Sequence, residues 1–301
     1  MRDADSHGVP NEDAAGPPQG GPAARPPKGK PGARLADVCA RRAAVYQALA
    51  LGFGEPTLAY LTALADGELV DGLREAVAWL GPAAAAYEPA FAVLSQAGAA
   101  VARTGVAAAV GAAAVEHARL FTGPGRPAVP CYASQYLDAA PGRAPRLNEA
   151  AAAYAAAAYE AEGVVPADLP RELPDHVAIE LEFLFHLCRR EEAAWDAGDA
   201  AEATRLRRAL DAFLREHAAR FFAGFAGAVA AALPAALYAA LAELLAVHAV
   251  VELGEQPPAR ETDRRPSAGE TGRRPPTGDT GEQPPAGETG RRPPTGGRPT
   301  G

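Results

Sequence analysis

The stretch ELPDHVAIELEFLFHL, residues 172–187, decides how this sequence is interpreted. It opens with Pro174, Asp175 and His176 and continues as an apolar run. A proline in the first turn of a helix loses no hydrogen bond, and an acid there is favoured by the helix dipole. From Val177 onward apolar residues recur three and four positions apart, which predicts a central helix buried over most of its circumference.

Two acids, Glu180 and Glu182, interrupt this apolar run. Glu180 lies four residues after His176, and His186 lies four residues after Glu182, so each pair shares one edge of the helix. This spacing leaves open a helical metal-dependent hydrolase or oxidase that uses all four residues. The sequence has neither the Glu-x-x-His pairs of di-iron bundles nor the His-Glu-x-x-His of zincins. We therefore expect no metal, no cofactor and no catalytic site.

The whole of residues 34–253 has the pattern of helices. Alanine is abundant, apolar residues recur at helical spacing, and the alternation typical of strands is absent. Glycine and proline mark the junctions, as at 81–82. We predict one compact all-α domain of about ten helices. The predicted helices are 34–51, 57–65, 71–80, 83–103, 107–121, 147–162, 175–197, 199–222, 223–233 and 235–253.

The two ends of the chain have a different composition. Residues 1–33 lack apolar periodicity, and residues 254–301 consist mainly of Gly, Pro, Thr, Glu and Arg. The C-terminal segment repeats every nine residues, for example GETGRRPPT at 269 and again at 287. Repeats without a bulky apolar residue have nothing to bury when stacked, so both ends are predicted to be disordered.

Charge and cysteine content restrict the partners and the compartment. Residues 34–253 contain 17 basic and 26 acidic residues, a net charge of −9. Such a surface argues against nucleic acid and fits a cationic partner. The three cysteines are far apart and form no CxxC pair, which indicates neither a zinc site nor a disulfide framework. Because we find no secretory leader and no membrane-length apolar run, we expect a cytoplasmic protein without stable membrane association.

One connection, residues 122–145, is long and rich in Pro and Gly yet carries the aromatic residues Tyr132 and Tyr136. Long ordered loops in compact domains are usually functional. Its GPGRP segment, 123–127, has glycines, but no Gly-Lys-Ser/Thr follows, so no phosphate loop is predicted. We expect this connection to pack against the helical body.

Two stretches together resemble a known family. EHARLFTGPGRPAVPCYASQYLD, residues 116–138, followed by the stretch quoted first, is similar to the two signature regions of the TorD/DmsD family of redox-enzyme maturation chaperones. The first signature has the form Glu-aromatic-x-x-Leu-Phe-x-Gly-Pro, and the second Pro-Asp-His-x-x-x-Glu-Leu-Glu-Phe. The resemblance covers about residues 34–253. His117 replaces the usual aromatic, and Cys131-Tyr132 stands where a Pro-aromatic pair is usual, which bears on client preference.

The resemblance implies a non-catalytic, all-α chaperone that binds the twin-arginine signal peptide, or the apo form, of a molybdopterin-dependent oxidoreductase. It would assist cofactor insertion and delay export until maturation. Because such a leader has two arginines before an apolar stretch, its receptor needs carboxylates beside an apolar groove. We assign Asp175 and Glu180 to the arginines and His176 to orienting them. The apolar wall is assigned to Phe121, Tyr132, Tyr136 and Phe183, and Gly123 and Pro124 belong to the same client-binding set. A generic helical scaffold is the remaining alternative.

Overall fold

The fold is helical throughout the part of the chain that the structure, a computed structural model, describes. No strand occurs among these residues, and an isolated antiparallel bridge joins Tyr132 and His176. The predicted all-α fold is thereby confirmed. The predicted disordered ends lie outside the described residues, except that the first helix begins at Pro31 and not at Arg34. The described residues are 31–123, 127–138, 146–147, 149–164 and 173–254.

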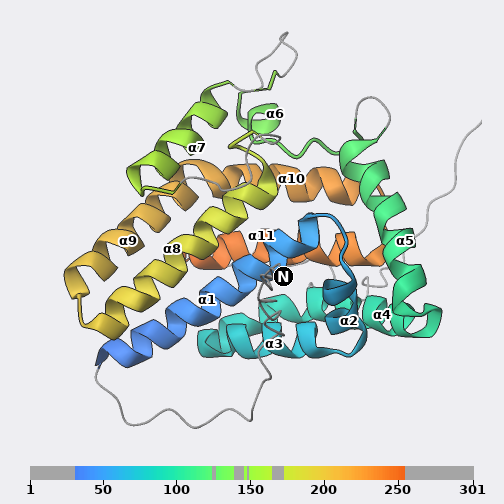
Figure 1. The fold of residues 1–301 in the computed structure, drawn as a ribbon, viewed down its shortest axis with the longest axis horizontal. Coiled ribbons are helices and arrows are strands. Elements are labelled where there is room, and N and C mark those ends of the chain that lie inside the picture. Colours follow the sequence, from blue (N-terminus) through green and yellow to red (C-terminus); the bar gives the residue numbers. More distant parts are fainter. Residues whose placement is uncertain (1–30, 124–126, 139–145, 148, 165–172, 255–301) are drawn as a thin grey trace, which may run out of the picture. The chain divides into compact units, whose positions relative to one another are not determined.

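The longest helices, α1 (Pro31–Phe53) and α8 (Val177–Ala197), pack along each other, and α9 (Ala200–Phe213) lies beside α8 (Figure 1). At the end of α8, Gly198 has a φ of 77°, which allows the left-handed conformation that closes a helix. Asp199 then caps α9 by accepting a hydrogen bond from the Glu202 amide. These two residues fold α9 back against α8.

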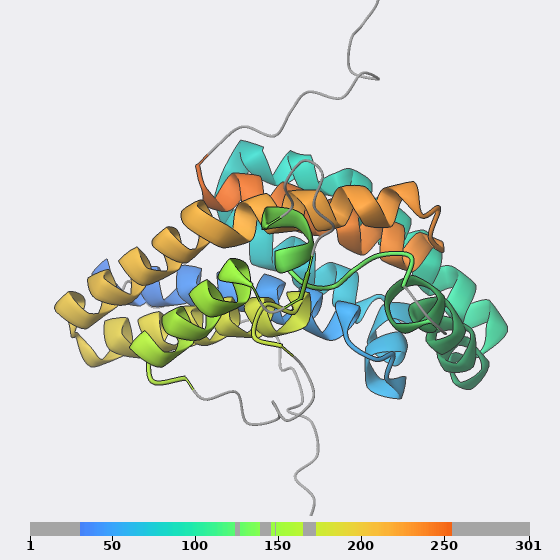
Figure 2. The ribbon, with the colours of Figure 1, turned by 90° about the horizontal axis from the view of Figure 1, so that it is seen from above.

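The other helices surround this pair. The C-terminal helix α11 packs against α10, α4 and α1, and α2 packs against α4 and α5 (Figures 1 and 2). The bounds are α2 Leu58–Ala65, α3 Glu68–Val77, η1 Ala78–Tyr87, α4 Glu88–Thr104, α5 Val106–His117, η2 Ala118–Thr122, α6 Ser134–Leu137, α7 Ala150–Ala161, η3 Leu214–Ala218, α10 Ala219–Ala231 and α11 Ala236–Glu252.

Beyond shifts of a few residues at the helix ends, one predicted break is absent and one short helix was not predicted. The break predicted between Phe222 and Ala223 is wrong: α10 runs through this point, although Gly224 follows it, and α9 and α10 are continuous through a π-type turn, η3. The break at Gly81 does occur, with a φ of 60°. The connection 122–145, predicted without helix, contains the single turn α6.

A charged cluster is buried in the core between α1, α8 and α11. The Arg42 guanidinium, 1% exposed, donates from Nε to both carboxylate oxygens of Glu252, at 2.9 and 2.8 Å. It also lies 3.4 Å from Glu191 on α8. Burial alone would raise the pKa of Glu252, but the attraction of Arg42 lowers it to about 2. This ion pair therefore fixes the end of α11 to α1.

The helical stretch Glu68–Thr104 has the length and hydropathy of a membrane span, as does the strongly bent pair 32–53 and 58–65 if it is counted as one span. Gly81 and Pro82 break the first stretch. Phe91 and Leu94 of α4 are fully buried in the core, and in the most apolar window of this stretch 28% of the residues are buried.

Candidate functional site

The long connection reaches the start of α8 and pairs with it. The Cys131 carbonyl accepts a hydrogen bond from the Val177 amide at 2.8 Å, and the Ala133 amide donates to the Asp175 carbonyl at 2.9 Å. The two signature stretches are thus in direct contact, although about 40 residues separate them. This confirms that the described part of the connection packs against the helical body.

Asp175 stabilises this junction through its buried side chain. Its side chain is fully buried, and its Oδ2 accepts a hydrogen bond from the Ser134 amide at 2.9 Å, at the first residue of α6. Its Oδ1 has no hydrogen-bond partner among the described residues. The neighbouring Pro174 carbonyl accepts a bond of 2.7 Å from the Tyr159 hydroxyl on α7. Asp175 is therefore a buried residue at this junction, whereas the sequence assigned it to the arginines of a leader.

His176 is the N-cap of α8. Its Nδ1 accepts a hydrogen bond from the Ala178 amide at 3.3 Å, which satisfies one of the free donors of the first turn. The imidazole meets the Tyr132 ring edge to face, with 5.3 Å between centroids. Both side chains are half-buried, so this pair combines a structural role with a partly accessible surface.

Glu180 is also buried and has a partner that the sequence did not reveal. Its Oε1 lies 2.7 Å from Nε2 of His217, and its Oε2 has no partner among the described residues. Burial raises the pKa of Glu180 to about 7, although the hydrogen bond from His217 opposes this shift. His217 lies in η3, and π-type turns often mark functional sites. The Tyr154 ring of α7 stacks on the imidazole, with centroids 5.0 Å apart.

The other residues that were assigned to the client site lie either in the core or in the long connection. Phe121 is a core residue that packs against the rings of Phe53 and Tyr238, so its assignment to the wall of a site differs from its place in the structure. Phe183 is likewise buried. Tyr136 is half-buried and donates a 2.8 Å hydrogen bond to the Pro130 carbonyl. Gly123 is half-buried, and Pro124 lies outside the described residues.

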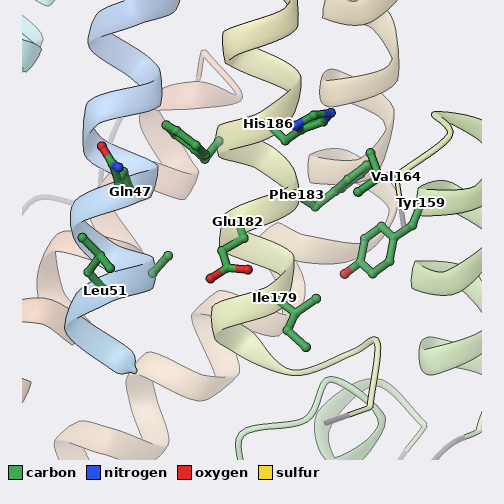
Figure 3. A pocket seen from close by; sticks show the side chains of 10 residues that line it. Gln47, Leu51, Tyr159, Val164, Ile179, Glu182, Phe183 and His186 are labelled. Carbon is green, nitrogen blue, oxygen red and sulfur yellow. The ribbon is translucent and has the colours of Figure 1, made fainter. Parts of the chain in front are cut away.

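A pocket of about 330 Å³ opens between α1 and α8, along the part of α8 from Ile179 to His186. Figure 3 shows Gln47 and Leu51 on α1 and Glu182 on α8, while the Tyr159 ring points from α7 toward α8. The lining is mostly apolar, and Glu182 is its carboxylate. The described lining residues are Gln47, Ala50, Leu51, Tyr159, Val164, Ile179, Glu182, Phe183, Phe185 and His186.

The chemistry of this pocket suits binding. Leu51 and Glu182 are exposed, so Leu51 can contact an apolar side chain of a ligand while Glu182 binds a cationic group next to it. Partial burial, with the nearby Arg190 charge, lowers the pKa of His186, which favours its neutral form. The four residues of the metal-enzyme alternative are not gathered into one centre: among the described residues, no group of three or more His, Cys, Asp or Glu is placed to hold a metal.

Comparison with known proteins gives one family. The family described as nitrate reductase delta subunit matches residues 81–227, which include both signature stretches and all of α8. No curated protein and no solved structure matches this chain.

Proposed function

Because this chain belongs to the TorD-like chaperone family that includes the nitrate reductase delta subunits, we propose that it binds the twin-arginine leader of a molybdopterin-dependent oxidoreductase. The family is non-enzymatic and acts with molybdoenzyme catalytic subunits. In this proposal the chaperone works in the cytoplasm and retains the apo-enzyme until its cofactor is inserted.

The pocket between α1 and α8 is the observation that supports the proposal. A leader of this kind places a cationic end next to apolar residues, and the pocket places the exposed Glu182 carboxylate next to Leu51, Ile179 and Phe185. A guanidinium forms strong paired hydrogen bonds with a carboxylate. Apolar side chains of the leader fill the space between the two helices.

The first turn of α8 extends the same site. Asp175 and Glu180 supply two further carboxyl groups in this proposal, Glu180 carrying a negative charge above its raised pKa of about 7, and the half-buried Tyr132 and His176 form the accessible edge. The two buried carboxylates each have an oxygen without a partner among the described residues. A cationic group that reaches them therefore meets acceptors that the protein itself leaves unused.

The pocket volume sets the scale of the affinity. About 330 Å³ holds one or two large apolar side chains, and burying each one contributes about 1.5–3 kcal/mol. Together with a charged hydrogen bond of about 1.5–3 kcal/mol, this gives about 3–9 kcal/mol before ordering costs are deducted. A Kd in the micromolar range corresponds to about −8 kcal/mol, so it requires further contacts along the leader.

Calorimetric titration with a synthetic Arg-Arg leader tests the proposal. We expect Glu182→Gln to weaken binding about fivefold to tenfold, because an amide loses the charge-assisted bond. Leu51→Gln removes an exposed apolar contact and should weaken binding without affecting folding. Glu192→Gln, on the same helix but outside the pocket, is the matched control.

Two results would contradict the proposal at different levels. Equal affinity in the parent and both pocket variants would remove the pocket as the binding site. A parent protein that does not discriminate between Arg-Arg and Gln-Gln leaders would remove the leader as the ligand.

A further inference from the structure

Helix α7 packs on the body through the small buried residues Ala151, Ala152 and Ala155 and through a few larger side chains. Its sequence, AAAAYAAAAYEA, has two large side chains, Tyr154 and Tyr159. The Tyr159 hydroxyl bonds the Pro174 carbonyl, and the Tyr154 hydroxyl donates to Glu216 at 3.0 Å. Just after the helix, Glu162 pairs with Arg205 at 2.7 Å. Figures 1 and 2 show α7 on the outside of α8 and α9.

The two tyrosines cover the buried acids. The Tyr154 ring lies nearly parallel to the His217 imidazole, at 15°, and His217 in turn bonds Glu180. The Tyr159 ring contacts Phe183, with centroids 4.6 Å apart, and its hydroxyl bonds the carbonyl of the residue before Asp175. Glu180 and Asp175 are both 0% exposed beneath this layer.

The layer beneath α7 has unused hydrogen-bonding capacity. Glu180 Oε2, Asp175 Oδ1 and Ser134 Oγ are buried and lack hydrogen-bond partners among the described residues. Buried polar atoms are normally paired, and a carboxylate oxygen without a donor is costly. A guanidinium carries five N–H donors and no acceptor, so it matches a group of unused oxygens.

The open pocket alone is insufficient for a pair of arginines. Of its ten described lining residues, Glu182 alone carries a carboxylate. Glu180 lies two residues earlier on the same helix, but Tyr154 and Tyr159 cover its surroundings. Tyr159 and Phe183 line the pocket and also belong to the covered layer, so the two regions share a wall.

We infer that α7 is a displaceable cover, and that its movement exposes Glu180, Asp175 and His217 as the second half of the client site. The cationic end of the leader then takes the place of the two tyrosines, while the apolar residues stay in the pocket. This inference rests on the proposed function and adds to it the step that regulates access.

Hydrogen exchange measured by mass spectrometry on the full-length chain tests the inference. Tyr159→Phe removes the bond to Pro174 but keeps the ring on Phe183. We expect the α7 amides to exchange about fivefold faster in this variant, because one hydrogen bond of the closed state is lost. The affinity for an Arg-Arg leader should rise by a similar factor, since opening costs less.

Tyr60→Phe is the matched control. The Tyr60 hydroxyl is also buried and bonds a backbone carbonyl, that of Ala48, at 3.2 Å, but it lies on α2. This variant should leave both the α7 exchange and the leader affinity unchanged. Adding the leader to the parent should speed α7 exchange and slow exchange in the first turn of α8.

Three results separate the possibilities. If α7 exchanges only together with α8 and α9 in every variant, α7 is a fixed part of the domain and the inference fails. It fails equally if the leader protects α7 and Tyr159→Phe weakens binding, because α7 is then a wall of the site. If no variant binds the leader, the proposed function fails, and the exchange measured without peptide still decides whether α7 opens by itself.

Discussion

The buried carboxyl group of Glu180 should make the stability of this protein depend on pH. Burial raises its pKa to about 7, the hydrogen bond from His217 acts against this, and the charge of Asp175 adds to it. The folded state therefore keeps a proton that the unfolded chain has released. The associated stability is fully present below about pH 4.5 and is lost as the pH rises through about 7.

The magnitude follows from the size of the shift. A pKa that moves from 4.5 to about 7 corresponds to roughly 3 kcal/mol, at about 1.4 kcal/mol per unit. Glu180→Gln cannot ionise, but it keeps the shape of the side chain and an oxygen for His217. We expect its free energy of unfolding, relative to the parent, to rise by about 3 kcal/mol between pH 4.5 and pH 8.

Urea denaturation followed by circular dichroism at several pH values between 4.5 and 8 measures this difference. Burial also lowers the pKa of His248 to about 4, but this contribution occurs in both proteins and cancels in the comparison. Glu182→Gln, an exposed carboxylate on the same helix, is the control and should follow the parent. If the free energy of unfolding changes with pH in the same way in Glu180→Gln and in the parent, the proton does not belong to Glu180.

Two further predictions concern packing. Arg42→Met should lower the free energy of unfolding by about 3–5 kcal/mol, because Glu252 is left buried without its cation. Urea denaturation should show that the double variant R42M/E252Q regains part of this stability. An equal loss of stability in the single and the double variant would contradict the role of the ion pair. Gly98→Ala should cost about 1–3 kcal/mol, since a Cβ there would lie 2.3 Å from the Leu64 carbonyl oxygen. For Gly111→Ala the added Cβ meets no atom within 4 Å, so the free energy of unfolding should rise by up to about 1 kcal/mol. Thermal unfolding measures both variants, and midpoints that shift in the same direction would contradict this account.

The sequence predicted the helices better than the surroundings of their side chains. Helix α8 follows from the apolar spacing after Val177, because that spacing depends only on neighbours along the chain. The burial of Asp175 depends on α6 and α7, which no local pattern places above it. The partner of Glu180 is His217, 37 residues away, and it lies in a π-type turn, Leu214–Ala218, that contains no glycine or proline to mark it.

The contacts of the signature residues indicate that the residues that identify the family differ from those that select the client. Glu116 of the first signature accepts a 2.9 Å hydrogen bond from the Ala235 amide at the start of α11, and Asp175 of the second binds the first residue of α6. Both acids thus fix turns in the fold, a requirement that is the same whatever peptide is bound. Gln47 and Leu51 line the pocket from α1, which neither signature includes. Client preference should therefore depend on this wall of the pocket more than on the residues by which the family is identified.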